Sequence, residues 1–355
     1  MTDEYPVFFE TSPFSLVADE QAAQCWSGRH SIHKSLEELR RTLSRRADSS
    51  LDVVWANLGA GKTHTLFHFA YLLENDAQSR FLPVFLEMPE QVRNFVDIYK
   101  RIAAALPVDR LADIIVSSPR GKLPPNLERA GNTLKHGAAK EKNTVHSWLC
   151  AERPYISELR ACSGIGERIE DDLAATEMLQ GIVRAFDIAK CRLVLLIDEF
   201  QRVGLVKPSV RTRILSSLRT VFSRSPRYFS TVIAVQSQVE QSALDLVPPE
   251  LKTLIGRKAT ISLPEMDLPE ATEFVIGRFR FFRPSGYIGD ETAPFDRDAI
   301  PSILEYMKEG AGIPLNPREI LQAFASVYDH SEDLSGAIKS SDALSILKTV
   351  YEHKE

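Results

Sequence analysis

The chain contains few cysteines, and they follow no site motif. The four (Cys25, Cys150, Cys162 and Cys191) are scattered over 355 residues without C-x-x-C spacing. This scatter argues against a zinc site and against a disulfide framework, and it favours reduced thiols. We therefore expect a cytoplasmic protein.

Long hydrophobic runs and a basic excess are also absent. No apolar run approaches the roughly 20 residues that cross a bilayer. The N-terminus, Met1 to Tyr5, is acidic and lacks the basic start and apolar body of a signal peptide. We expect no membrane partner. The net charge of −5 gives no global attraction to nucleic acid, so any DNA contact must come from local basic patches.

The most informative stretch is an apolar run that leads into a glycine-bearing loop, then Lys-Thr, then a helical pattern (residues 53–66). This order predicts a phosphate-binding P-loop, in which backbone N–H groups and a helix N-terminus converge on an anion. Lys62 would reach the β- and γ-phosphates and Thr63 would ligate Mg²⁺. The predicted ATP-contacting residues are Ala56, Asn57, Leu58, Gly59, Ala60, Gly61, Lys62, Thr63 and His64.

One position departs from the strict P-loop motif. The first glycine of G-x-x-x-x-G-K-[ST] is Ala56 here, at the start of the loop, where a small residue can suffice. Two alternatives stay open at this point. The GAGKT stretch could be a chance turn, or the protein could bind a nucleotide and hydrolyse it hardly at all.

A second motif pairs with the first. Residues Leu193 to Ile197 form an apolar run followed by Asp198 and Glu199. Such a run suits a strand buried on both faces of a parallel sheet, and acids at its carboxyl end lie where α/β sheets bind ligands. We expect Asp198 to hold Mg²⁺ through water and Glu199 to polarise the attacking water. A core strand that ends in a solvated acidic turn is the alternative.

Periodicity places further elements along the chain. Strand patterns cover 81–86, 229–235 and 259–263. Helical patterns cover 31–46, 91–106, 176–190, 207–223, 269–282, 297–309, 317–328 and 341–352. Residues 107–145 show no clear period and are rich in Pro, Gly and Lys/Arg, so they read as an irregular basic insertion.

In this order the motifs resemble an AAA+ ATPase of the origin-recognition-initiator branch, and its relatives among transposon regulators and ATP-binding proteins of phage-defence islands. The resemblance covers about residues 11–328. It implies that Arg29, in Trp26-Ser27-Gly28-Arg29, lies near the adenine. It nominates Ser237 as sensor 1, with Gln236 as rival, and Arg257 as an arginine finger acting in trans ahead of a strand. It also nominates Arg318, in the segment 312–321, as sensor 2 of a helical lid.

Each of these arginines has a simpler alternative. Arg257 assists hydrolysis only if it lies on an exposed oligomer face, where it can neutralise charge on the γ-phosphate of a neighbour. Arg318 follows Pro317, which suits the first position of a helix, and it could be a plain surface arginine. Ser237 could simply end a strand.

Two basic clusters could contact DNA phosphates, or could be solvated surface. One lies in 118–143 (Arg120, Lys122, Arg129, Lys135, Lys140 and Lys142, against Glu128 and Glu141), and the other comprises Arg40, Arg41, Arg45 and Arg46. The segment 118–143 contains no aromatic residue, which argues against base stacking there. Only residues 329–355 follow the lid, so we expect any DNA contact to come from the ATPase core.

The sequence thus predicts an α/β P-loop NTPase with a central parallel sheet and a C-terminal all-helical lid. We expect an N-terminal segment (1–50), an ATPase core (51–266) and a lid with a tail (267–355). The expected function is a Mg·ATP-dependent homo-oligomeric switch on double-stranded DNA, or on a nuclease or transposase partner, in a mobile-element or anti-phage setting. The alternative is a nucleotide-gated signalling scaffold that activates an effector without DNA.

Overall fold

The computed structural model describes residues 8–352, except 78–79, 226, 246, 248, 253–254 and 332–336. The chain forms two compact units. The first unit comprises residues 1–36, 56–71 and 262–355, and the second comprises residues 37–55 and 72–261. Each unit has its own hydrophobic core.

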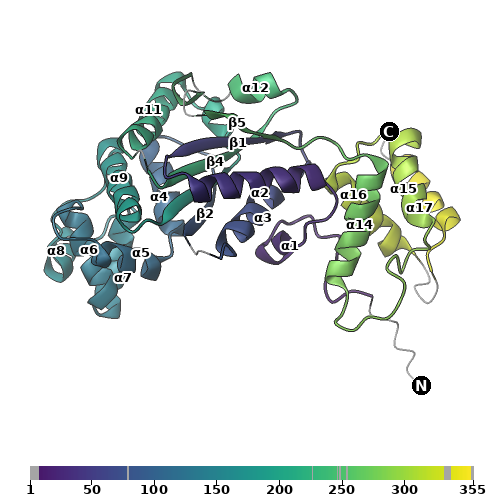
Figure 1. Ribbon diagram of the computed structural model, residues 1–355, viewed down its shortest axis with the longest axis horizontal. Coiled ribbons are helices and arrows are strands. Elements are labelled where there is room, and N and C mark those ends of the chain that lie inside the picture. Colours follow the sequence, from purple (N-terminus) through teal and green to yellow (C-terminus); the bar gives the residue numbers. More distant parts are fainter. Residues whose placement is uncertain are drawn as a thin grey trace. The chain divides into compact units, whose positions relative to one another are not determined.

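A five-stranded parallel sheet forms the centre of the second unit (Figure 1). Its strands are β1 (Ser50–Ala56), β2 (Phe81–Glu87), β3 (Arg192–Asp198), β4 (Phe229–Gln236) and β5 (Ile255–Ser262), in the spatial order β2-β3-β4-β1-β5. Because the strands are parallel, β1 and β3 have their carboxyl ends at the same end of the sheet, with only β4 between them. The loop after β1 and the acids after β3 therefore both leave the sheet at this end.

The apolar runs found in the sequence form the most buried strands. Every residue of β3 is buried, and β2 pairs with it so that Glu87 lies opposite Asp198. A strand buried on both faces needs a continuous apolar run, which Leu193 to Ile197 supply. At the opposite end of the sheet, buried Arg192 donates hydrogen bonds to the Asp48 carbonyl (2.9 Å) and to Ser230 Oγ (2.8 Å).

Helices of the second unit pack around this sheet. The long helices α4 (Phe95–Ala105), α9 (Asp172–Ile188) and α11 (Pro208–Arg224) contact one another, and α9 also contacts β3 and β4. Shorter helices are α10 (Arg202–Leu205), α12 (Glu240–Asp245) and α13 (Pro249–Lys252). The helix α2 (His30–Arg45) begins in the first unit and continues into the second.

The prediction of an irregular insertion is wrong. Residues 107–163 fold into the helices α5 (Val108–Ser117), α6 (Pro125–His136), α7 (Ala139–Leu149) and α8 (Ile156–Ser163). Pro107 and Pro124 precede the first helical residues of α5 and α6, so these prolines mark helix starts rather than loops. Apolar side chains such as Leu111, Leu127 and Leu134 join the core of the unit and stabilise the bundle.

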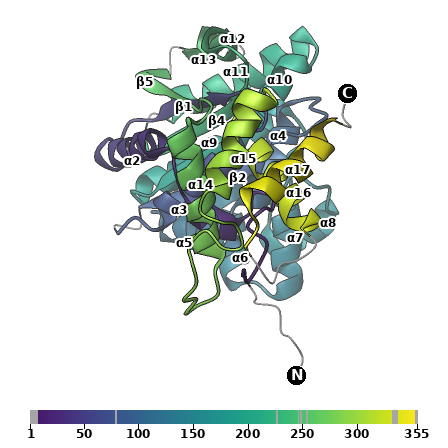
Figure 2. The same ribbon diagram turned by 90° about the vertical axis from the view of Figure 1, so that its right-hand side faces the viewer.

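The first unit combines α1 (Glu20–Gln24), most of α3 (Lys62–Glu74) and the C-terminal helices. The latter are α14 (Leu268–Phe282), α15 (Ala299–Glu305) with a π-helical turn (Tyr306–Gly310), α16 (Pro317–His330) and α17 (Ser340–Glu352). Figure 2 shows α14–α17 packed side by side, as expected for a helical lid. Their core includes Phe279, Ile303 and Phe324, and Phe14 from the N-terminal segment.

All eight predicted helices and all the predicted strands are present, with ends shifted by a few residues. The largest shift among the strands concerns β5, which begins at Ile255 rather than at residue 259. In the described part of the chain, no helix is both long enough and apolar enough to cross a membrane. The three-part division at residues 50 and 266 stays a prediction.

Candidate functional site

The predicted P-loop is a tight loop between β1 and α3. Gly59 and Gly61 have φ angles of +76° and +88°, a backbone region that glycine adopts without steric cost. A Cβ on Gly59 would lie 3.0 Å from Asn316 Oδ1 and 3.1 Å from Arg318 Cβ. Both glycines are therefore required by the loop's shape, and Gly59 also by its close approach to the lid.

The N-terminus of the lid helix α16 meets this loop. Asn316 caps the helix by accepting a hydrogen bond from Glu319 N (3.0 Å), and Pro317 is the first helical residue, as predicted. Arg318 N donates to Gly59 O at 3.3 Å, while the Arg318 side chain is exposed. Since α3 also begins at the loop, two helix N-termini with their partial positive charge converge there.

Lys62 and Thr63 form the first turn of α3. Lys62 is 7% exposed, and its Nζ donates to Asn57 O at 3.3 Å, so the ammonium group is held over the loop. Thr63 is half-buried. Ala56 is the last residue of β1 and is buried, so the position that the strict motif gives to glycine is here part of the strand.

Arg29 holds the loop from a third direction. Its Nη1 donates to Ala60 O (2.6 Å) and its Nη2 to Pro264 O (2.7 Å), while its Nε is buried without a hydrogen-bond partner. Burial lowers the pKa of Arg29 to about 10, and Coulombic attraction by Glu270 opposes that shift. Arg29 also has a left-handed backbone (φ 47°). Its observed role is to clamp the P-loop; contact with the nucleotide stays a prediction.

His64 belongs to a buried aromatic stack rather than to the loop surface. Its ring stacks on Trp26 at 5.9 Å, Nε2 lies 3.1 Å from Cys25 O, and Trp26 in turn contacts His33 and His68. Burial lowers the pKa of His64 to about 4, with Coulombic repulsion from Arg278 adding to the shift. The His64 side chain is therefore neutral, and only its backbone N–H fits the predicted anion contact.

The acids after β3 lie at the carboxyl edge of the sheet. Asp198 ends β3 and is 3% exposed, and its Oδ1 accepts a hydrogen bond from Glu199 N at 2.8 Å. Glu199 has φ +55°, a conformation that is costly for a residue with a Cβ. Such strain persists only where surrounding contacts enforce it, and it is common at functional sites.

Gln201, which the sequence reasoning missed, connects this acid to the neighbouring strand. Its Nε2 donates to Glu199 Oε2 at 2.7 Å, and its Oε1 accepts from Gln236 N, at the end of β4, at 3.1 Å. Arg202 Nε lies 3.8 Å from the same Glu199 oxygen. The only signal for Gln201 in the sequence was its place two residues after Glu199.

The two remaining nominees are placed less specifically. Ser237 follows β4, and its hydroxyl donates to Val239 O at 2.7 Å in a local turn. Arg257 lies inside the edge strand β5 rather than ahead of it, because that strand begins earlier than predicted, and its side chain lies outside what the structure describes. Both roles stay predictions.

The chemical types of these residues fit a nucleotide phosphate chain and Mg²⁺. Glycines that admit no Cβ, a helix N-terminus and Lys62 suit a phosphate chain, and a hydroxyl with a carboxylate suits Mg²⁺, which prefers oxygen ligands. Thr63 belongs to the first unit and Asp198 to the second. Their sharing of one ion stays a prediction. Among the described residues, no cluster of three or more His, Cys, Asp or Glu could hold a metal.

No protein-family model and no curated protein matches the chain. Solved structures do. The ORC2 protein of Aeropyrum pernix in its ADPNP–ADP complexes is 12% identical, with a TM-score of 0.60, over 96% of this chain and 72% of that one. The ORC1 protein of the same organism in complex with DNA is 11% identical, with a TM-score of 0.51, over 94% and 71%.

The chain has the fold of an AAA+ ATPase. The P-loop and the acids after β3 occur in this AAA+ fold in the order that the sequence analysis predicted. The predicted fold class is therefore confirmed, and so is the likeness to origin-recognition proteins. At sequence identities near 12%, the likeness to these structures shows the fold alone.

Proposed function

We propose that this protein is an ATP-controlled switch that binds Mg·ATP, assembles into a homo-oligomer and acts on double-stranded DNA. The observation that carries the proposal is the P-loop geometry: two left-handed glycines, buried Lys62 and two helix N-termini at one loop. The ORC structures support it because they were determined with ADPNP and ADP, and with DNA.

The residues divide the work of ATP hydrolysis. Lys62 would bind the β- and γ-phosphates, Thr63 would ligate Mg²⁺ and Asp198 would hold that ion through water, and the ion would neutralise charge on the phosphates. Glu199 takes the proton from the water that attacks the γ-phosphorus, and the bond to the β-phosphate oxygen breaks. Arg318 neutralises charge from the lid of the same subunit, and Arg257 does so from a neighbour.

The wider setting follows from the family resemblance found in the sequence. We propose that the switch recruits a nuclease or transposase partner, in a mobile-element or anti-phage defence context. Because hydrolysis removes the γ-phosphate that Arg318 and Arg257 contact, turnover would release the assembly.

Two measurements on the full chain test the proposal. Calorimetric titration with ATP and Mg²⁺ should show binding, and size-exclusion chromatography should show a larger species with ATP than with ADP. Fluorescence anisotropy with a labelled duplex should show ATP-dependent, salt-sensitive binding. ATP binding without any DNA binding at low salt would instead support the signalling scaffold, and no ATP binding would reject both functions.

A further inference from the structure

A forty-residue stretch of the second unit contains no acidic residue. Residues 200–239 hold seven basic residues and no Asp or Glu, whereas 48 acids in 355 residues correspond to about five in forty. The seven are Arg202, Lys207, Arg211, Arg213, Arg219, Arg224 and Arg227. This stretch is separate from the two basic clusters considered in the sequence analysis, and it centres on α11.

The composition of α11 is unusual for an exposed helix. Its buried side is apolar and includes Ile214, Leu218 and Val221. All ten of its polar side chains are arginine, serine or threonine: Ser209, Arg211, Thr212, Arg213, Ser216, Ser217, Arg219, Thr220, Ser223 and Arg224. The outer face of α11 therefore offers only guanidinium and hydroxyl groups.

The arginines of this face are not neutralised. Arg211, Arg213, Arg219 and Arg224 are exposed, and within the described part of the chain none makes an ion pair or a side-chain hydrogen bond. A helix without acids also lacks the i,i+4 pairs that usually stabilise a charged surface. Four uncompensated positive charges along one helix create a local positive potential despite the net charge of −5.

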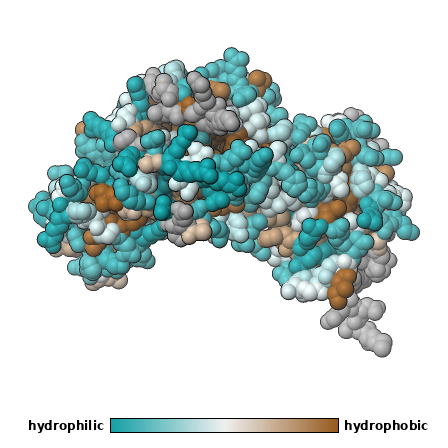
Figure 3. Space-filling model, in the orientation of Figure 1, coloured by the Kyte–Doolittle hydropathy of each residue, from teal (hydrophilic) through white to brown (hydrophobic). Residues whose placement is uncertain are grey.

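Some basic residues elsewhere in the second unit are paired with acids. Arg40 contacts Glu37 (2.9 Å) and Asp76, and Arg41 lies 3.9 Å from Glu37. In the helical insertion, Lys135 pairs with Asp113. Figure 3 shows strongly hydrophilic side chains over α2, but Glu37 offsets part of their charge. Hydrophilicity alone therefore does not distinguish α11; the absence of acidic residues from the helix does.

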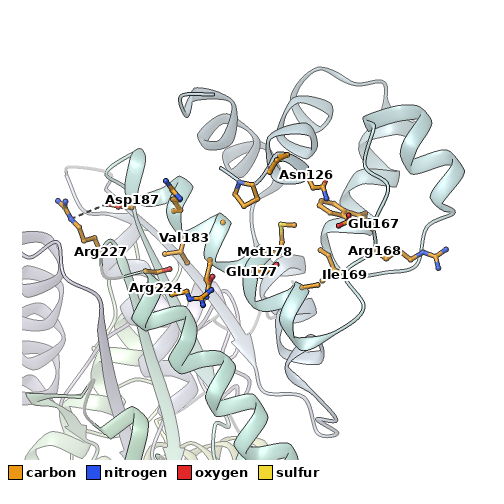
Figure 4. Close-up of a pocket in the computed structure, with 18 residues that line it drawn as sticks. Asn126, Glu167, Arg168, Ile169, Glu177, Met178, Val183, Asp187, Arg224 and Arg227 are labelled. Atoms are coloured by element: carbon orange, nitrogen blue, oxygen red, sulfur yellow. Dashed lines mark hydrogen bonds and ion pairs between the residues drawn. The ribbon is translucent and has the colours of Figure 1, made fainter. Parts of the chain in front are cut away.

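The C-terminal end of α11 borders a cavity of about 910 Å³ (Figure 4). Arg224 and Arg184 face it without ion-pair partners among the described residues. The cavity wall also carries Glu167, Glu177 and Asp187, and Asp187 lies 3.9 Å from Arg227. The cavity therefore has mixed charge, whereas the outer face of α11 carries positive charge only.

The chemistry of this face matches a phosphate backbone. Arginine, serine and threonine side chains are frequent donors to DNA phosphates, which fix position without reading sequence. The one aromatic residue of α11, Phe222, is buried, so the helix offers no platform for base stacking. A helix of 17 residues is about 25 Å long, and duplex DNA carries one charge per ~1.7 Å of its axis, so several phosphates lie within reach.

We propose that the outer face of α11 is the surface through which this protein binds double-stranded DNA, by its phosphates and independently of sequence. The proposal rests on the DNA part of the proposed function and names the surface that performs it. An acidic protein partner would be attracted by the same charge, but the regular mixture of hydroxyl and guanidinium groups favours phosphates.

Matched triple variants of the full chain test the assignment. Arg213→Ala/Arg219→Ala/Arg224→Ala removes three charges from α11, and Arg41→Ala/Arg45→Ala/Arg46→Ala removes three from the end of α2. Anisotropy with two labelled 30-base-pair duplexes of unrelated sequence is measured across a salt series. The α11 variant should lose tenfold or more in affinity at low salt, and its log K against log salt slope should fall by roughly 0.9 per lost contact. The α2 variant should change that slope by less than about one.

Several outcomes would overturn the assignment. Equal losses in both triples would mean that net charge, and not this face, controls binding. An unchanged α11 variant would leave an acidic protein as the remaining partner. If the wild-type protein binds ATP but neither duplex, the DNA part of the proposed function fails together with this inference.

A separate variant protects the test against misfolding. ATP affinity and the thermal unfolding midpoint of each triple are measured first. If the α11 triple is unfolded, Ser216→Glu places one negative charge on the same exposed face, and Ser216→Gln is its neutral control. The glutamate variant alone should weaken duplex binding, and equal binding by both would contradict the proposal.

Discussion

The residues proposed to bind and hydrolyse ATP form two sets of opposite charge. The phosphate half, in the first unit, comprises Gly59, Gly61, Lys62, Arg29 and Arg318. The carboxylate half, in the second unit, comprises Asp198, Glu199 and Gln201. The first is built from backbone groups and cations around one loop, and the second from acids at a sheet edge.

This difference assigns different tasks to the two halves. Cations and helix N-termini stabilise bound phosphates in the ground state, so we expect the phosphate half to control ATP affinity. A carboxylate contributes little to binding a polyanion but can accept a proton during turnover, so we expect the carboxylate half to control the rate of hydrolysis. Variants in the two halves should therefore separate affinity from turnover.

The largest effect is expected from Glu199→Gln, which removes the proton acceptor from the carboxylate half. We expect ATP turnover to fall by about 10²- to 10⁴-fold, with ATP affinity within about twofold of wild type. The variant should also accumulate as an ATP-bound assembly. Phosphate release and size-exclusion chromatography measure both, with exposed Glu177→Gln as the control. Unchanged turnover and oligomer size would show that Glu199 is not the base.

The next effect is expected from Lys62→Ala in the phosphate half. Loss of a charge-assisted hydrogen bond costs about 1.5–3 kcal/mol, so ATP affinity should fall about 10- to 100-fold. Calorimetric titration checks this, with exposed Lys308→Ala of the first unit as the control. Wild-type ATP affinity in the Lys62 variant would show that the P-loop lysine does not bind ATP.

A smaller effect is expected from Gln201→Ala, because Gln201 acts through its hydrogen bond to Glu199. One lost hydrogen bond of about 1 kcal/mol corresponds to roughly a fivefold lower kcat with an unchanged KM. In the Glu199→Gln background the same change should have no further effect on turnover, since the base that Gln201 positions is already gone. A fall in KM and kcat together, or full additivity, would point to a general structural role.

A prediction of another kind concerns the pH dependence of stability, to which Asp52 in the second unit and His64 in the first contribute with opposite sign. Burial raises the pKa of Asp52 to about 6, against a hydrogen bond from Ser50 and the charge of Arg192, which lower it. The unfolded carboxyl titrates near 3.8, so the folded state binds more protons between pH 4 and 6, and stability from Asp52 falls as pH rises. The lowered pKa of His64 acts oppositely: stability rises between its folded value, about 4, and its ordinary value, 6.5.

Asp52→Asn should remove only the contribution to stability that falls as pH rises. From pH 4 to pH 6, the free energy of unfolding of the variant should rise relative to that of wild type by up to about 3 kcal/mol, which corresponds to about two pKa units. Urea unfolding at both pH values measures this, with exposed Asp48→Asn as the control. A parallel pH dependence of variant and wild type would contradict the burial argument.

Local sequence signals predicted much of the architecture. The Val, Leu and Ile runs of β1 and β3 and the 3.6-residue periods of the long helices gave their positions, because burial on both faces or on one stripe leaves a periodic trace. Pro317 correctly marked the start of α16. The short helices α5–α8 were missed, because their prolines and charges resemble loop composition and only Leu111, Leu127 and similar side chains join them to the core.

The sequence by itself determined the shape of the loop between β1 and α3, since glycines, a lysine and a following helix produce that geometry from local backbone preferences. The tertiary structure alone decided which distant residues support the site. Arg29 clamps Ala60 and Gln201 holds Glu199, and the outer face of α11 is left without counter-charges. Such contacts depend on which elements pack together, and no spacing along the chain encodes them.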